Sequence, residues 1–221
     1  MLFRSTRLGG GAEGVAAARA LTMVTAFLPG SMYIYQGDEL GLQDCPVPPE
    51  ARRDPIWRRS GFTNPGRDAA RVPMPWDSMQ TNFGFSTAAA NDLWLPISPD
   101  WRPTSAAAQI RDPASTWTLY QRMLSLRRRH PGWREPCSMR ARHGQWELTR
   151  GSLRLVVNTT DEPAPVLHYG TVLARSRMDV PWEPGVLPPR AAVLLETSDP
   201  ESQVEGETLF GVSRSHIVDP H

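Results

Sequence analysis

The pattern of apolar and polar positions predicts a helix near the start of the chain. Alanine dominates residues 12–27, and apolar side chains recur there at helical spacing. Three glycines precede this segment, and Pro29-Gly30 follow it, so both ends of the helix are marked. Its apolar surface is broad, which indicates burial against a sheet.

A short apolar run at residues 32–35 follows the first predicted helix. It is rich in aromatic and β-branched residues and lies between turn residues, which predicts a fully buried strand. The run ends at Gly37, Asp38 and Glu39, and sites in βα barrels are built at that end of the strands. Successive strand residues point to opposite faces, so the two carboxylates do not form a converging pair. We expect one to cap backbone N–H groups of the next loop and the other to pair with an arginine.

A long loop and a second helix come next. Residues 43–111 show no sustained periodicity but contain seven Trp and Phe residues, which favours an ordered, functional loop. Asp112 and Pro113 then predict a helix start, with Asp as the N-cap. The basic run 127–130 closes this helix and complements its dipole.

Short apolar runs with Pro and Gly between them predict a small antiparallel β domain in the last third of the chain. The expected strands are residues 145–149, 153–158, 166–167, 171–175 and 191–196. After Thr197 the sequence is polar, and we expect a loosely ordered tail.

Composition excludes several classes of partner. The net charge is +1 and the arginines are scattered, which argues against nucleic acid and anionic membranes as partners. The apolar run 20–28 is too short to span a bilayer, and the N-terminus lacks a signal peptide, so we expect a cytoplasmic protein. Cys45 and Cys137 are interpreted as free thiols. We find no sequence motif for a metal or a cofactor.

Four motifs in order resemble the α-amylase family, glycoside hydrolase family 13, and within it the α-glucosidases and oligo-1,6-glucosidases. The motifs are YIYQGDELGL at 33–42, DPIW with RSG at 54–61, GRDAARVPMPW at 66–76, and WLP at 94–96 followed by the helix ending in His130-Pro131. A final run, LPPRAAVLL at 187–195, is similar to the end of the C-terminal β domain of that family.

This resemblance implies an α/β plus all-β fold: the last strand and flanking helices of a (β/α)8 barrel, then a small antiparallel β-sandwich. The expected division is residues 1–131 for the barrel part, 132–197 for the β domain and 198–221 for a flexible tail. We expect residues 1–130 alone to pack poorly, whereas residues 133–196 are a candidate for marginally stable independent folding.

The family resemblance also implies a function. Complete members hydrolyse α-glucosidic bonds with a nucleophile, an acid/base and a stabilising carboxylate on earlier strands. The last of these lies in an Asn-His-Asp motif that this chain does not contain. We therefore expect a segment without catalytic residues, inactive alone, that acts on an α-glucoside or oligosaccharide only in the complete enzyme. Alternatives are a non-catalytic saccharide-binding module, a module complementing an N-terminal barrel half, or part of a trehalose synthase-like isomerase.

Asp68, Arg71 and Trp76 are the candidate substrate-binding residues. A guanidinium and an aromatic plane suit sugar recognition, because hydroxyls accept forked hydrogen bonds and C–H faces stack on rings. The alternative for Arg71 is an ion pair with Asp68 or Asp77 that only holds the loop. For Trp76, a buried anchor of the loop is favoured over a stacking platform.

Overall fold

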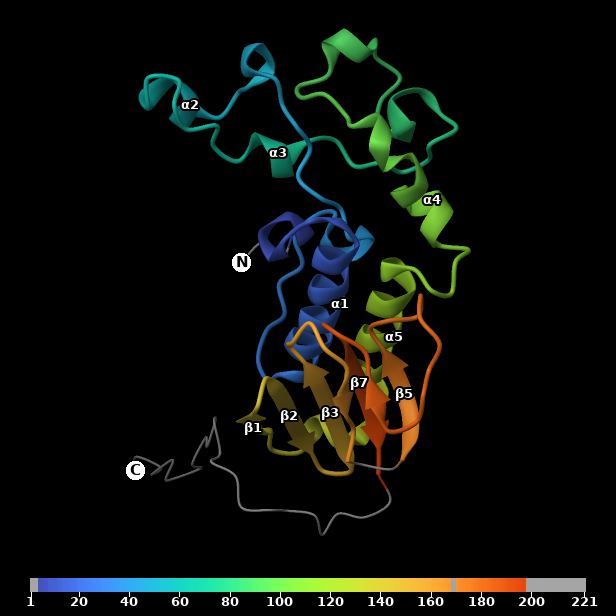
Figure 1. Cartoon of the computed structure of the whole chain (residues 1–221). Coiled ribbons are helices and arrows are strands. Elements are labelled where there is room, and N and C mark those ends of the chain that lie inside the picture. The colour runs from blue at the N-terminus through green and yellow to red at the C-terminus, as the bar shows by residue number, and fades with distance from the viewer. Residues whose placement is uncertain (1–3, 168–169, 198–221) are drawn as a thin grey trace, which may run out of the picture.

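The computed structural model describes residues 4–167 and 170–197 (Figure 1). Its α-helices are α1 (Gly11–Phe27), α2 (Pro55–Arg59), α3 (Asp68–Arg71), α4 (Ala106–Gln109) and α5 (Thr116–Arg129). Its strands are β1 (Ser138–Arg142), β2 (Gln145–Arg150), β3 (Leu153–Asn158), β4 (Ala164–Pro165), β5 (Thr171–Arg175), β6 (Val186–Leu187) and β7 (Ala192–Glu196). Short 3₁₀ turns occupy Ser5–Leu8, Asp38–Leu40, Pro49–Ala51, Thr81–Gly84, Ala90–Asp92, Pro99–Thr104 and Pro131–Arg134.

The C-terminal part is an antiparallel sheet with the strand order β1-β2-β3-β7-β5. Strand β3 lies at its centre and is buried along its whole length, because both faces of the sheet are covered. A two-stranded ladder, β4 with β6, packs on one face through Val166 and Leu187. The predicted small β-sandwich is therefore formed by two sheets of unequal size.

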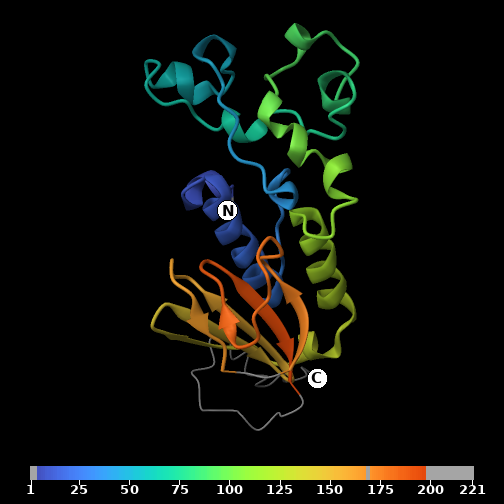
Figure 2. The same ribbon diagram turned by 45° about the vertical axis from the view of Figure 1, so that its right-hand side comes forward.

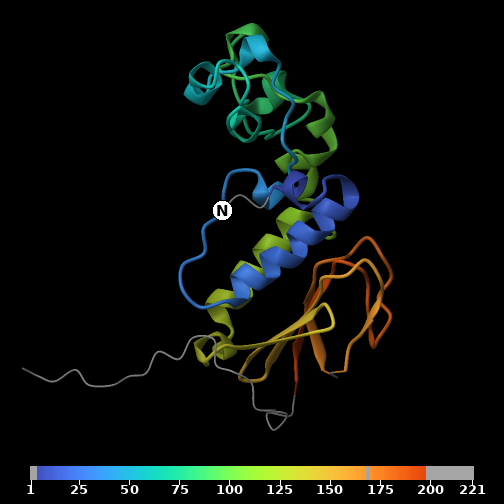
Figure 3. The same ribbon diagram turned by 60° about the vertical axis from the view of Figure 1, so that its left-hand side comes forward.

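Helices α1 and α5 cover the opposite face of the larger sheet (Figure 3). Alternate residues of β3 and β7 point toward the helices, as the two-residue period of a strand requires. The shared core contains Ala20, Met23, Val24, Ala26 and Phe27 of α1, Leu119 and Met123 of α5, Trp133, and Leu148, Leu153, Leu155, Val157, Ala174, Ala192 and Leu194 of the sheet. The core is thus continuous across the domain boundary expected at residue 131, and that division stays a prediction.

The C-terminal end of α1 is capped by side chains from the other two layers. Arg127 of α5 donates hydrogen bonds to the carbonyls of Ala26 and Leu28, at 2.5 and 2.7 Å. Trp133 Nε1 also donates to Ala26 O, at 3.0 Å, and Arg150 donates to Phe27 O, at 2.9 Å. The last carbonyls of a helix have no partner inside it, so these donors stabilise the end of α1 and bind it to α5 and the sheet.

The long loop forms a lobe of its own, at the end of the helix pair that is remote from the sheet (Figures 1 and 2). It contains only short helices, as the lack of periodicity predicted. A second apolar cluster fills this lobe: Leu40, Leu42, Cys45, Val47, Val72, Met74, Leu95, Trp101 and Ala106. The aromatic loop is therefore ordered around a small core.

The predicted buried strand at residues 32–35 is wrong. The segment is extended, but it joins no sheet in the part of the chain that the structure describes. Figure 3 shows it on the side of the helix pair that faces away from the sheet. Tyr33 is 86% exposed and Ile34 is 42% exposed. A barrel strand is buried only between neighbouring strands, and the described residues supply none there.

Other elements differ in their limits from the prediction. The second helix has Ser115 as its N-cap, whose Oγ accepts from Thr118 N–H at 3.1 Å, whereas Asp112 accepts from Ala114 N–H in a turn before it. The small fourth strand lies at Ala164–Pro165, not at 166–167, and β1 and β6 were not predicted. The strands 145–149, 153–158, 171–175 and 191–196 are confirmed to within one residue. The expected tail lies outside the described residues.

Candidate functional site

The candidate site spans residues 54–76 of the loop lobe, and Asp54 organises it. Asp54 is the N-cap of α2: its Oδ1 accepts from Ile56 N–H at 3.0 Å, and its Oδ2 accepts from Arg67 N–H at 2.9 Å. These backbone donors, with smaller help from the Arg71 charge, hold the pKa of Asp54 below its usual value. Gly66 makes this approach possible, because a Cβ there would lie 2.5 Å from Asp54 Cγ.

Asp68 is a buried structural residue of the same lobe, 2% exposed. Its Oδ2 accepts from the backbone N–H groups of Arg53, at 2.5 Å, and Asp54, at 2.8 Å. It therefore fixes the turn that presents Asp54 to Arg71. Because Asp68 is buried and makes these bonds, its role in the site is to hold the backbone.

Arg71 pairs with neither Asp68 nor Asp77 in the structure. Its Nη1 lies 3.0 Å from Asp54 Oδ2, and its side chain is 43% exposed. A guanidinium carries five N–H donors, so one bond to Asp54 orients the group and leaves its other face open to solvent. Arg71 is thus both anchored and accessible.

Trp76 is 51% exposed, which contradicts the favoured interpretation of a buried anchor. Its backbone holds the position: Trp76 N–H donates to Phe83 O at 2.9 Å, and Trp76 O accepts from Ala107 N–H at 2.8 Å. The loop core is filled by Trp101 instead, which is 6% exposed. The indole ring of Trp76 is available for a ligand on a rigid backbone.

Arg4 was missed by the sequence analysis and connects the site to the helix pair. It is 1% exposed and donates to three backbone carbonyls, Gln36 O at 3.0 Å, Ala70 O at 3.1 Å and Gln43 O at 3.4 Å. Burial lowers the pKa of Arg4, and the nearby carboxylate of Asp38 opposes that shift. No local sequence pattern identifies this arginine, because its acceptors are 32 to 66 residues away.

The two acids after the extended segment lie at the end of the helix pair. Asp38 is 7% exposed and its charge acts on Arg4, in keeping with the expected arginine partner. Glu39 is half-buried. The expectation that one of them caps the next loop stays a prediction.

The two carboxylates of the site hold the backbone of the loop. Both carboxylates of the site, Asp54 and Asp68, are held by backbone N–H groups. Among the described residues no group of His, Cys, Asp and Glu could hold a metal ion. In the same residues, no helix is long and apolar enough to cross a bilayer.

A second aromatic group lies beside the site. The Trp57 and Phe62 rings meet edge to face at 5.4 Å, and the Arg52 guanidinium lies 4.2 Å from the Trp57 ring centre. Trp94 is 72% exposed and has Arg53 over its ring at 5.8 Å. Trp57 and Trp94 belong to the sequence motifs. The sequence pattern does not predict, however, which aromatic side chains are exposed.

Comparison with protein families gives a match over residues 4–135, more than half of the chain, to the alpha-amylase catalytic domain. The chain is 35% identical over 136 residues to an alpha-glucosidase of Pediococcus pentosaceus, covering 53% of this chain and 24% of that protein. It is 38% identical over 124 residues to a probable alpha-glucosidase of Rhizobium meliloti, covering 54% and 22%. A trehalose synthase/amylase of Mycobacterium tuberculosis is 34% identical over 116 residues, covering 51% and 16%.

Solved structures show the same architecture. Trehalulose synthase MutB from Pseudomonas mesoacidophila superposes with a TM-score of 0.66 at 26% identity, over 82% of this chain and 38% of that one. A mutant of MutB in complex with its substrate sucrose gives a TM-score of 0.67 at the same identity and coverage. The partial barrel followed by a β domain is thereby confirmed, and the chain spans about a quarter of the length of the curated alpha-glucosidases it matches.

Proposed function

The chain belongs to the alpha-amylase family of glycoside hydrolases, and from this premise we propose that it is the C-terminal portion of an α-glucosidase-like enzyme. In that enzyme it supplies the loop that contacts an α-glucoside or oligosaccharide, while the nucleophile, the acid/base and the stabilising carboxylate lie on preceding barrel strands. By itself the chain does not turn over substrate.

The loop from Asp68 to Trp76 carries this proposal. Arg71 is oriented by Asp54 yet 43% exposed, and Trp76 presents half of its surface to solvent. Hydroxyl groups of a sugar bind the free N–H groups of Arg71, and the C–H face of a sugar ring stacks on Trp76. Asp68 supports these two residues indirectly, because it fixes the backbone of residues 53 and 54.

The exposed segment at residues 31–36 supports the proposal that an N-terminal barrel half packs against this chain. Tyr33, at 86% exposure, and Ile34 belong to a sequence rich in strand-forming residues. Addition of neighbouring strands from an N-terminal barrel half would bury both side chains and satisfy the extended backbone. We place that half either in the same polypeptide or in a separate one that complements this chain.

An isomerase is the second candidate. Both a trehalose synthase/amylase and trehalulose synthase MutB are among the similar proteins. Hydrolases and isomerases of this kind differ in whether water or a sugar hydroxyl attacks the bound glucosyl group, and the loop of this chain is compatible with either acceptor. A purely saccharide-binding module is the third candidate.

A chimera tests these functions. The barrel region preceding the matched segment of the Pediococcus pentosaceus α-glucosidase is fused to residues 4–221, and hydrolysis of p-nitrophenyl α-glucoside is measured beside the chain alone. We expect turnover only from the chimera. Arg71→Ala in the chimera should raise KM more than it lowers kcat, because a substrate contact is lost, whereas the exposed Arg128→Ala should change neither.

The products separate the candidates. Glucose released from maltose supports the hydrolase, and an isomeric disaccharide supports the isomerase. A folded chimera without turnover that still binds maltose would support the binding module. Turnover by the isolated chain would contradict the placement of the catalytic carboxylates outside it.

A further inference from the structure

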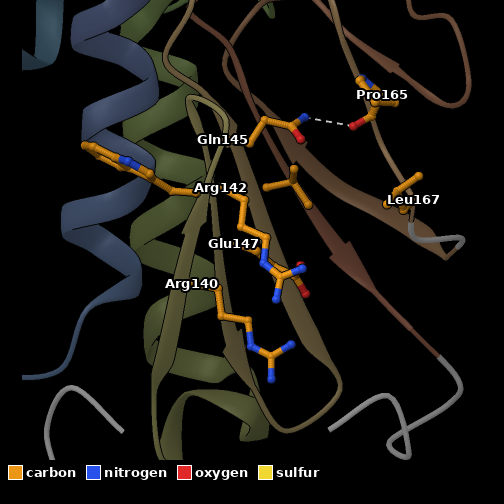
Figure 4. A pocket seen from close by; sticks show the side chains of 8 residues that line it. Arg140, Arg142, Gln145, Glu147, Pro165 and Leu167 are labelled. Atoms are coloured by element: carbon orange, nitrogen blue, oxygen red, sulfur yellow. Dashed lines mark hydrogen bonds between the residues drawn. The ribbon is translucent and has the colours of Figure 1, made fainter. Parts of the chain in front are cut away.

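The outer face of the large sheet carries a groove that the proposed α-glucosidase function does not use. It has a volume of about 170 Å³ and lies between the β1-β2 hairpin and the segment that follows β4 (Figure 4). The loop lobe with Arg71 is at the other end of the molecule (Figure 1). Any ligand in this groove is therefore separate from the substrate loop.

One wall of the groove is charged. Arg140 and Arg142 stand two residues apart on the edge strand β1, so both side chains project from the same face. Arg140 is the register partner of Glu147, and Arg142 is the partner of Gln145. The two guanidinium groups and one carboxylate give this wall an excess of one positive charge.

Arg140 has hydrogen-bonding capacity that the protein does not use. Its Nη2 is buried and has no hydrogen-bond partner among the described residues. A buried donor without an acceptor is unfavourable, so an acceptor brought by a ligand is bound favourably after a small movement of this side chain.

The facing wall is apolar. Pro165 and Leu167 form it (Figure 4), and the buried Val156 also lines the groove. Leu167 is 80% exposed, so its side chain is free to pack against a ligand. A hydrogen bond of 2.8 Å from Gln145 Nε2 to Pro165 O closes one end of the groove. The volume is below the roughly 300–1,000 Å³ of sites for drug-sized ligands, which limits the ligand to about one ring.

We propose that this groove binds a phosphorylated monosaccharide. The phosphate lies against Arg140 and Arg142, because guanidinium groups bind phosphate oxygens through paired, charge-assisted hydrogen bonds. The C–H face of the sugar ring packs on Pro165 and Leu167. Each wall of the groove thereby contacts the matching part of the ligand.

Glucose 6-phosphate is the probe for this site, with glucose and inorganic phosphate as separate arms. Residues 1–221 labelled with ¹⁵N are titrated at low salt, and the side-chain amide of Gln145 is followed by NMR. We expect glucose 6-phosphate to bind at least about tenfold more tightly than glucose or phosphate. Because the pair of arginines is partly exposed, added salt should weaken the binding.

Variants assign the binding to the groove. Arg142→Ala should weaken glucose 6-phosphate binding by about tenfold or more, and Arg142→Lys should recover only part of it because lysine cannot form the paired bonds. The matched control is Arg128→Ala, an exposed arginine on α5, which should leave binding unchanged. Arg71→Ala should also leave it unchanged, so this site can fail or succeed independently of the proposed substrate loop.

Three results would overturn the proposal. Equal binding of inorganic phosphate and glucose 6-phosphate would show an anion patch that does not recognise the sugar. Equal binding of glucose and glucose 6-phosphate, or no shift of Gln145 with any of the three, would show that Arg140 and Arg142 do not form a phosphate site. Circular dichroism of each variant confirms that the protein is folded.

Discussion

At the scale of single residues, the loop lobe depends on polar side chains that replace the hydrogen bonds of regular secondary structure. Asp54 and Asp68 together accept from four backbone N–H groups. Arg4, in contrast, is a donor and binds three backbone carbonyls. Buried backbone groups must find partners, and here three charged residues provide them for a segment whose helices are all short.

Substitutions at Gly66 and Gly61 distinguish two costs of adding a side chain, backbone strain and a steric clash. Both have positive φ, +71° and +64°, but a Cβ at Gly66 would meet Asp54 Cγ at 2.5 Å, and one at Gly61 would meet nothing within 4 Å. Gly61→Ala should therefore cost only the left-handed backbone strain, about 1 kcal/mol. Gly66→Ala should cost about 2–3 kcal/mol, because a clash is added.

Thermal unfolding and the rate of tryptic cleavage after Arg67 measure this difference. The cleavage rate should rise much more in Gly66→Ala than in Gly61→Ala. Equal behaviour of the two variants would mean that the contact between Gly66 and Asp54 does not hold the loop.

The loop should also open in acid. The folded state lowers the pKa of Asp54, so its contribution to stability is present above the unfolded pKa of about 3.9 and is lost as the pH falls through the folded value. Hydrogen exchange of the Arg67 amide, which donates to Asp54 Oδ2, reports this directly. We expect its protection factor to fall as the pH is lowered below about 4.

Asp54→Asn is the matched variant, since it keeps the shape of the side chain and removes the titration. Its Arg67 amide should be weakly protected both above and below about pH 4. A wild-type protection factor that does not change with pH would contradict the role of the ionised Asp54.

At the scale of elements, α1 is stabilised less by its own sequence than by its neighbours. Its carbonyl end accepts from Arg127 of α5, from Trp133 and from Arg150 of β2. Its apolar residues pack against α5 and the sheet in one cluster. We therefore expect helix and sheet to unfold together, although the sequence made the β domain a candidate for independent folding.

Met23 and Met79 test this coupling as a matched pair. Met23 in α1 is fully buried and Met79 in the loop lobe is 88% exposed. Met23→Ala should destabilise the protein by about 3 kcal/mol, because buried Met→Ala changes cost 2–5 kcal/mol. Met79→Ala should change the free energy of unfolding by less than about 0.5 kcal/mol.

Urea unfolding is followed by far-UV circular dichroism for the helices and by near-UV signals of Trp133 and Trp146 for the sheet side. Coincident transitions, shifted together by Met23→Ala, are expected. A sheet-side transition that stays in place while the helical signal shifts would show that the β domain folds alone.

Elements with a strong local pattern were predictable from the sequence, and elements that depend on distant partners were not. The first helix and the strands β2, β3, β5 and β7 follow from periodicity and turn residues. The segment at residues 32–35 has a strand-like sequence, but a strand needs neighbours that the described residues lack. Ser115 replaces Asp112 as the helix cap because the chain makes an additional turn at Asp112.

The candidate site was predictable only in part for the same reason. The motif placed Asp68, Arg71 and Trp76 in one loop, but the partners of Arg71 and the exposure of Trp76 depend on how the loop folds. Asp54, which lies in the neighbouring motif, binds Arg71 across 17 residues. Arg4 acts across still longer separations and is identified only by the structure.

At the scale of the whole molecule, the exposed segment beside α1 predicts self-association. Tyr33 and Ile34 are exposed on an extended backbone, and unpaired extended segments of apolar sequence recruit other chains. The double variant Tyr33→Lys with Ile34→Lys should reduce association, because edge lysines oppose strand pairing. Light scattering against protein concentration measures the effect.

Met79→Lys provides the control, since it replaces a similarly exposed apolar residue outside this segment. It should leave association unchanged. If it reduces association as much as the double variant does, general surface hydrophobicity rather than the extended segment is responsible.

The cluster shared by α1, α5 and the sheet also limits how such a gene can recombine. A crossover placed between the helix ending at Arg129 and the strand beginning at Ser138 would join a foreign β domain to helices selected for other side chains, and Met23, Met123 and Leu153 would lose their partners together. Exchanges inside the loop lobe leave that cluster intact. Homologues that have traded parts should therefore show paired junctions within residues 43–111, so that the loop lobe is exchanged while both helices stay with the C-terminal sheet.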